Sequence, residues 1–353
     1  MTVISSPNAA ALPSGLLGLL AADSQSVQNR LTQFSEQSST GLVAQTYGGM
    51  GAAAQISLDL RPQLAEVGAY TQNIAQAGAQ LTTTSNVLDQ LQQIASTFAS
   101  GLLSVNSSTS QEVDTLASQA SAALTQVQSL LNTQVGDKYI FAGQDSGNAP
   151  LPDTQFNAYV GAIKTAVGGL TATNGAAAIA ATLSAATTNS PFSATLGAAP
   201  EQVRVGVGTT TPVGIVAGQN AYVTQTGSGT TGSYVRDLIR SLATISGLNS
   251  SQVGLSPGFA SVVSDTLANL RNEVTVINNE NAGVGAAQQN LTSDQTNLTD
   301  TQTALTTQIS AAENVDAAST ATALSQAQTQ LQISYKLIAS VESMSLVSFL
   351  PTQ

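Results

Sequence analysis

Apolar residues recur every seven positions along two long windows of the chain, one beginning near residue 60 and the other after Pro257. Seven-residue spacing that is kept over many turns is typical of helices that pack along a coiled-coil seam. We therefore predict a packing seam made of Leu60, Val67, Ile74, Leu81, Leu88, Val263, Leu270, Ile277, Val284, Leu291, Leu298 and Leu305.

Proline positions separate the helical parts of the chain from the rest. No proline lies between Pro62 and Pro150 or between Pro257 and Pro351, whereas five of the ten prolines fall within residues 150–212. Proline interrupts helix interiors because it lacks the N–H group and its ring clashes with the preceding turn. This distribution predicts helix-rich ends around an inserted region.

The longest expected helix sets the shape of the molecule. A helix over residues 258–313 would be roughly 85 Å long at 1.5 Å per residue. A compact globule of this chain length has a radius of gyration of only about 20 Å. We therefore expect a rod. Apolar spacing predicts two further helices, over 113–130 and 324–341.

Residues 139–235 differ from both flanks, because Gly, Ala, Thr and Asn dominate there and the seven-residue spacing is lost. Alternating and short apolar runs predict four strands, at 139–141, 201–207, 213–216 and 222–224. A short helix is expected over 234–246, and loose Ala/Gly loops are expected near 165–200.

Together these patterns predict a mainly α fold. It consists of an elongated antiparallel coiled-coil helical rod made from both chain ends, with a small β-rich inserted domain. The expected parts are an N-terminal helix region, the first half of the rod, the outer β-rich domain, the second half of the rod and a C-terminal helix. In chain order they span residues 1–42, 43–138, 139–235, 236–313 and 314–353.

Composition excludes much enzyme chemistry. The chain contains no Cys, His or Trp, and only 8% of its 353 residues are charged. Without Cys or His there is no Ser–His or Cys–His nucleophile pair, no usual zinc site and no disulfide. The net charge of −11 argues against nucleic-acid and anionic-membrane partners, which need a basic surface. We therefore expect a structural protein without a metal, a cofactor, a nucleic-acid partner or membrane insertion.

One glycine-rich stretch matches a cofactor motif. Gly227–Gly232 has the GxGxxG spacing of a dinucleotide site and lies between a predicted strand and a predicted helix. Such a site also needs a parallel βαβ unit and an acid about twenty residues later, and residues 249–252 offer no acid. A glycine-rich turn explains the match better, and an enzyme that uses this loop is the weakest functional alternative.

The exposed faces of the expected helices lack charge. No Lys or Arg occurs from Pro62 to Asp137 or from Asn272 to Tyr335, so no i,i+4 ion pairs support these helices. The chain ends are apolar, and residues 1–22 contain no charged side chain. One interpretation is an ordinary coiled coil that has become polar. The sharper interpretation is that neighbouring copies bury these faces.

Several motifs at the two ends of the chain are recognisable. They are Asn29–Phe34 and Ser39–Leu42 in the N-terminal part, and Asn281–Ala286, Glu313–Asp316, Ala327–Gln332, Ser345–Leu346 and Phe349–Leu350 in the C-terminal part. In this pattern the chain resembles the flagellin family of bacterial flagellar axial proteins, over residues 25–145 and 235–350. Within the family, Gly136–Gly143 is similar to the segment where proteins of the hook–filament junction leave their helical stalk.

The resemblance implies a structural, non-enzymatic subunit that polymerises into a tube or ring beside neighbouring flagellar axial proteins. It implies export without a cleaved signal through the flagellar type III channel, with a chaperone on the C-terminal helix. It also implies an extracellular place in the bacterial flagellum, where the protein serves motility. The terminal helices would form the inner tube, with assembly ends that include Leu31, Phe34, Leu331, Ile338, Leu346, Phe349 and Leu350.

Three functions follow in order of preference. The first is the junction between hook and filament, and the second is a flagellin subunit of the filament. A self-associating surface adhesin, with the β-rich region as its binding head, is a less favoured alternative of another class.

Overall fold

The structure is a computed structural model that describes residues 12–105, 110–197 and 199–347. Its fold is mainly α, and helices from the two ends of the chain pack antiparallel. The chain divides into two compact units. The first combines the described residues up to Glu66 with those from Asp300 onward, and the second runs from Val67 to Thr299.

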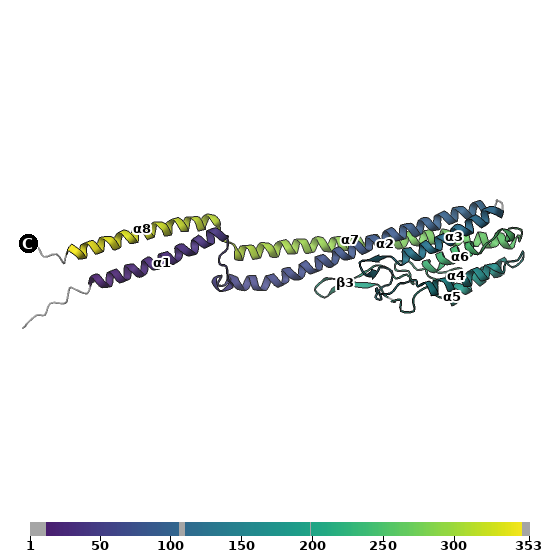
Figure 1. The fold of residues 1–353 in the computed structure, drawn as a ribbon, viewed down its shortest axis with the longest axis horizontal. Coiled ribbons are helices and arrows are strands. Elements are labelled where there is room, and N and C mark those ends of the chain that lie inside the picture. The colour runs from purple at the N-terminus through teal and green to yellow at the C-terminus, as the bar shows by residue number, and fades with distance from the viewer. Residues whose placement is uncertain (1–11, 106–109, 198, 348–353) are drawn as a thin grey trace, which may run out of the picture. The chain divides into compact units, whose positions relative to one another are not determined.

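The first unit is built on a pair of helices. α1 (Leu12–Thr40) packs against α8 (Ala317–Val347), and Figure 1 shows them side by side in purple and yellow. The unit also holds a 3₁₀ helix, the start of one long helix and the end of another. These are η1 (Tyr47–Gly49), α2 (Ala53–Val105) and α7 (Gly258–Glu313).

The second unit contains the remainder of α2 and α7 and the segments between them. In chain order these are α3 (Ser110–Leu131), β1 (Gln134–Val135), β2 (Lys138–Tyr139), α4 (Asp153–Gly168), α5 (Gly175–Thr188), β3 (Glu201–Gly206), β4 (Thr209–Val213), α6 (Tyr234–Gly247) and η2 (Ser250–Gln252). β1 pairs with β2 and β3 pairs with β4, each as an antiparallel two-stranded sheet. α6 packs against α3, α4 and α5, and its Leu238 and Leu242 are fully buried.

The predicted seam residues lie mostly in the interior of their units. Those buried in the hydrophobic core of the second unit are Ile74, Leu81, Leu88, Val263, Leu270, Ile277, Val284 and Leu291. Val67 and Leu298, at the limits of that unit, are half-buried. In the first unit Leu305 is buried and Leu60 is half-buried. Removing these side chains from water stabilises the helices by about 25 cal/mol per Å² of apolar surface.

Polar side chains also bond to one another between α2 and α7. Asn281 Nδ2 donates to Asp89 Oδ1 at 2.7 Å, and Ser85 Oγ donates to Asn281 Oδ1 at 2.7 Å. Seven residues further along α7, about two helical turns, Gln288 Nε2 donates to Thr82 Oγ1 at 3.4 Å. A shift of one helix along the other would leave these groups without their partners, so the bonds fix the register of the two helices.

Several helix predictions are confirmed. The helix expected over 258–313 is α7, and the one expected over 234–246 is α6. The remaining two predicted helices lie within α3 and α8. α2 begins before the proline-free window, at Ala53, and continues through Pro62. Pro62 and Leu58, whose carbonyl loses its helical donor, are both exposed, so water can reach that carbonyl.

The inserted segment is more helical than its composition predicts. The expectation of loose loops near 165–200 is wrong over 165–168, the end of α4, and over 175–188, which forms α5. This stretch is rich in alanine, and alanine is the best helix former. Composition with many small residues was therefore a poor guide to loops here.

The strand predictions succeed only in part. The strand over 201–207 is confirmed as β3, but the strand over 213–216 is wrong beyond Val213, and the one over 139–141 is wrong beyond Tyr139. The strand over 222–224 is wrong, because its backbone N–H groups do not join a ladder. Those of Tyr222 and Val223 donate to a buried carboxylate instead.

Candidate assembly surface

The interface between α1 and α8 is lined by small or β-branched side chains. Its buried residues are Ser24 and Val27 of α1 and Thr320, Ala327 and Ser334 of α8. The three α8 residues recur every seven positions and so form one stripe. Small side chains at a contact allow two helix axes to approach closely. Gln28 Nε2 also donates to the Tyr335 hydroxyl across the pair.

Large apolar side chains stay exposed on the same pair. The exposed fraction is 71% for Leu19 on α1, and 52%, 49% and 49% for Ile333, Tyr335 and Leu337 on α8. Two helices cover only one stripe of each other, so apolar side chains on the remaining faces are left in water. Ile333 and Leu337 are four residues apart and share one face of α8, so these exposed side chains make the helix pair a candidate for protein–protein contact. We refer to these four residues as the assembly surface.

The predicted assembly ends lie on these two helices as far as the structure describes them. Leu31 and Phe34 of α1 are half-buried, as are Leu331 and Ile338 of α8. Leu346 lies within α8, but its side chain is outside the described part of the chain. The predicted residues Phe349 and Leu350 lie outside the described residues.

A backbone-paired turn fixes the end of α1 beside the start of α8. Val43 N–H donates to the Glu313 carbonyl at 2.7 Å, and Val315 N–H donates to the Gly41 carbonyl at 2.9 Å. Gly41 has φ +72°, a left-handed conformation that glycine adopts easily at the end of a helix. The two helices of the assembly surface are therefore joined at one end by main-chain hydrogen bonds.

Glu313 is the polar anchor of this turn. Its carboxylate accepts hydrogen bonds from Arg61 Nε at 2.8 Å and Arg61 Nη2 at 2.7 Å, and a third from the Ser57 hydroxyl. The hydrogen bonds from Arg61 and then Ser57, with the Arg61 charge, lower the pKa of Glu313 below its ordinary value. The anchor therefore acts as an ionised acceptor at neutral pH.

We expect Glu313→Gln to lower the melting temperature at neutral pH, because glutamine offers Arg61 no charged bidentate acceptor. A depressed pKa gives stability that is present above the unfolded-state pKa and lost as the pH falls through the folded-state pKa. Melting curves of the two proteins should differ at pH 7 and converge well below pH 4.5. A difference that stays the same at every pH would argue against an ionised anchor.

Asp316 begins α8. Its Oδ1 accepts from the Ala318 N–H at 3.1 Å, and its Oδ2 accepts from the Ser319 hydroxyl at 2.6 Å. The hydrogen bond from Ser319, followed by that from Ala318, lowers the pKa of Asp316. A carboxylate at this position satisfies N–H groups that have no partner within the helix, so it fixes where α8 starts.

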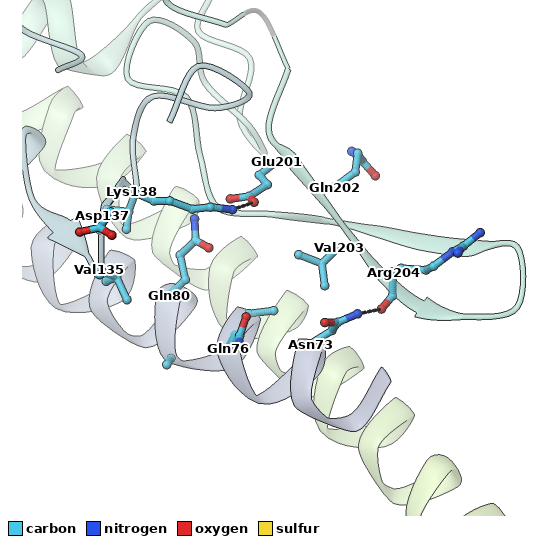
Figure 2. Close-up of a pocket in the computed structure, with 14 residues that line it drawn as sticks. Asn73, Gln76, Gln80, Val135, Asp137, Lys138, Glu201, Gln202, Val203 and Arg204 are labelled. Atoms are coloured by element: carbon cyan, nitrogen blue, oxygen red, sulfur yellow. Dashed lines mark hydrogen bonds and ion pairs between the residues drawn. The ribbon is translucent and has the colours of Figure 1, made fainter. Parts of the chain in front are cut away.

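A groove of about 640 Å³ lies in the second unit between α2 and the hairpin of β3 and β4 (Figure 2). Figure 2 shows Asn73 reaching the hairpin from α2, where its Nδ2 donates to the Arg204 carbonyl at 3.1 Å. Near the start of β3, Lys138 forms an ion pair with Glu201. These contacts attach the hairpin to the rest of the unit, which is a structural role.

The Gly227–Gly232 loop is bonded to an acid of the same chain. Thr231 N–H donates to both carboxylate oxygens of Asp237, at 3.1 and 3.0 Å, and the Thr230 hydroxyl donates to the same carboxylate. Arg240 Nη2 donates to the Gly229 carbonyl at 2.6 Å. The Thr231 N–H, a group of the kind that binds phosphate in dinucleotide sites, is thus already paired. The geometry supports the glycine-rich turn rather than the cofactor motif.

The two helical ends of the chain match models of one protein family. Residues 20–146 match the bacterial flagellin N-terminal helical region, and residues 267–350 match the bacterial flagellin C-terminal helical region. Together the two matches span more than half of the chain. The chain belongs to the flagellin family.

A solved structure from Vibrio parahaemolyticus, described as a "putative flagellar hook-associated protein", is also similar to this flagellin-family chain. The sequence identity is 15% and the TM-score is 0.42, over 71% of this chain and 96% of that one. No curated protein matches the chain.

Membership of the flagellin family defines the broad role of the protein. It is a structural subunit of the extracellular bacterial flagellum, and proteins of this family polymerise into the flagellar axial assemblies. Among the residues that the structure describes, no helix combines the length and the apolar character needed to cross a membrane.

Sequence reasoning misses two sets of residues in this flagellin-family protein. The seven-residue rule finds the inner stripe of a helix, so it passes over the outward-facing Ile333 and Leu337. It also passes over Glu273 and Glu280 of α7, which are 1% and 0% exposed. With Thr266 these acids form a buried series at steps of seven. Their seven-residue spacing could have indicated burial, but a search restricted to apolar residues does not include acids.

Proposed function

We propose that this flagellin-family protein forms the junction between the flagellar hook and filament, and that it polymerises through α1 and α8. The observation that carries the proposal is the assembly surface, where large apolar side chains lie exposed on both helices. Burying one such side chain fully stabilises an interface by about 1.5–3 kcal/mol. A row of copies would cover this surface along its whole length.

The resemblance of Gly136–Gly143 to junction proteins favours the junction over the filament. In the structure this segment contains the turn between β1 and β2, β2 itself and the four residues that follow it. Gly143 has φ +63°, and a Cβ placed on it would lie 2.5 Å from the Ala199 carbonyl oxygen. Only glycine fits there, so the backbone conformation at the end of this segment is fixed by its contact with residue 199.

Each part of the chain has its own place in the proposed junction. Residues 1–42 and 314–353 line the inner tube, residues 43–138 and 236–313 form the two halves of the rod, and residues 139–235 face outward. Before assembly, the exposed apolar side chains of α8 need a cover. We propose that an export chaperone supplies it by binding the C-terminal helix.

Immunogold labelling of intact flagella tests the function. If the protein is the junction subunit, antibodies should decorate one narrow band at the distal end of the hook. A strain that lacks the protein serves as the control for antibody specificity. Label along the whole filament would replace the junction with the filament-subunit alternative, and label on the cell envelope would favour the adhesin.

A further inference from the structure

A segment without charge is held down by acidic side chains in the second unit. Residues 219–232, which we name the strap, connect β4 to α6 and contain no Asp, Glu, Lys or Arg. The strap adds no strand to either sheet of the unit. Its polar backbone groups instead bond to side chains of α6 and α7, so those side chains decide whether it stays in place.

The first attachment is Glu280 on α7. Its Oε1 accepts from the N–H groups of Tyr222 at 3.0 Å and Val223 at 2.8 Å, and its Oε2 accepts from Ala221 N–H at 3.0 Å. Next to it, Gly283 leaves room for the Tyr222 ring, because a Cβ on Gly283 would lie 2.2 Å from Tyr222 Cγ. The middle of the strap thus lies directly against α7.

The second attachment is Asp237 on α6, which binds Thr230 and Thr231 at the end of the strap. Asp237 is itself paired with Arg240, with 3.3 Å between Oδ1 and Nε, and both side chains are buried. Arg240 also binds the Gly229 carbonyl. This end of the strap is therefore held by a complete ion pair.

The third attachment, Glu273 on α7, is incomplete. Its Oε1 accepts from Gln225 Nε2 of the strap at 3.0 Å, but its Oε2 is buried and has no partner among the described residues. The hydroxyl of Tyr234 is likewise buried without a partner there. Burial, followed by the charge of Asp237, raises the pKa of Glu273 to about 8.

The surroundings of Glu273 give an ionised carboxylate little compensation. Besides burial, the charge of Asp237 raises the pKa of Glu273, whereas the Gln225 hydrogen bond, the charge of Arg240 and the neighbouring Asn272 amide lower it. The other titratable or charged side chains on the elements nearby are Tyr234 and Arg236 of α6, Asp265, Glu280 and the exposed Arg271 of α7, and Tyr222 of the strap. Arg240 is already paired with Asp237. α2 contributes no charged residue from Gln90 to Val105. A proton on Glu273 removes the buried charge that this environment opposes.

We propose that the strap is a proton-controlled latch, which is held on α7 while Glu273 carries its proton and loosens as that proton is lost. With the strap open, water reaches Glu273, and its pKa returns towards 4.5. Because the closed state keeps the proton up to about pH 8 and the open state does not, rising pH favours opening between these values. The closing constant should fall by up to tenfold per pH unit and level off above about pH 8.

Hydrogen–deuterium exchange of the full-length chain tests the latch. Protection factors for peptides that cover the strap, corrected for the intrinsic pH dependence of exchange, should fall from pH 5.5 to pH 8 and then stay constant. Glu273→Gln keeps an acceptor for Gln225 but cannot ionise, so its strap should show protection that does not change with pH. Asp294→Asn removes an acid from α7 far from the strap and should keep the wild-type slope.

Two results would overturn the latch. One is wild-type protection of the strap that does not depend on pH, and the other is a Glu273→Gln variant that keeps the wild-type slope. If the variant does not fold, the wild-type protection factors alone test the latch. A fall in strap protection that continues unchanged above about pH 9 would contradict it, because Glu273 is already ionised there. Peptides from α1 and α8 report on the other unit and show whether a change is confined to the strap. The inference concerns the second unit and does not depend on the proposed function.

Discussion

Leu337→Asp should abolish incorporation into the flagellum and leave the isolated chain folded. The side chain is half exposed in the single chain, so a carboxylate there stays hydrated. In a polymer that covers the assembly surface, every copy would bury that charge at a cost of several kcal/mol. Motility assays and electron microscopy of flagella measure incorporation, and circular dichroism of the purified variant measures folding.

Leu337→Met is the matched control for this prediction. It keeps an apolar side chain of similar volume, so assembly and motility should remain near the wild-type level. A motile strain whose flagella carry Leu337→Asp in normal amounts would show that this side of α8 stays outside the interface. An unfolded Leu337→Asp chain would also contradict the prediction, since the residue would then support the single chain.

Adding one methyl group at two helix glycines of the second unit should change its stability in opposite directions. At Gly78 of α2 nothing lies within 4 Å of a new Cβ, so Gly78→Ala should gain about 0.5–1 kcal/mol from helix propensity. At Gly283 of α7 the Cβ would lie 2.2 Å from Tyr222 Cγ. Gly283→Ala should lose about 1–3 kcal/mol through overpacking. Urea unfolding followed by circular dichroism compares the two free energies of unfolding.

A second substitution locates the cause of the loss at Gly283. Because the clash is with the Tyr222 ring, Gly283→Ala should be less harmful in a Tyr222→Ala background than in the wild type. Equal losses in both backgrounds, or a Gly283→Ala variant as stable as the wild type, would mean that the ring does not constrain this position.

The long helices were predictable because one physical signal repeats along them. The apolar residues of α7 recur every seven positions along the helix, which begins directly after Pro257. Composition was a weaker guide to loops. α5 forms from a stretch that looks like a loose linker, since small residues are compatible with both a linker and a helix.

Contacts between distant residues account for most errors. The sequence around Tyr222 has strand character, but an acid more than fifty residues later takes up the backbone N–H groups that a strand would share. Nothing within the local sequence shows such a bond. On α8 the half-buried Leu331 and Ile338 follow from periodicity, whereas the more exposed Ile333 and Leu337 require knowledge of which face α1 covers.

The polar bonds between α2 and α7 have a consequence for the medium in which the protein works. Asn281, Gln288, Ser85 and Thr82 are neutral, and only Asp89 brings a charge to these contacts. Dissolved ions screen charges but have little effect on neutral amides and hydroxyls. The alignment of these two helices should therefore be the same in fresh water and in brine.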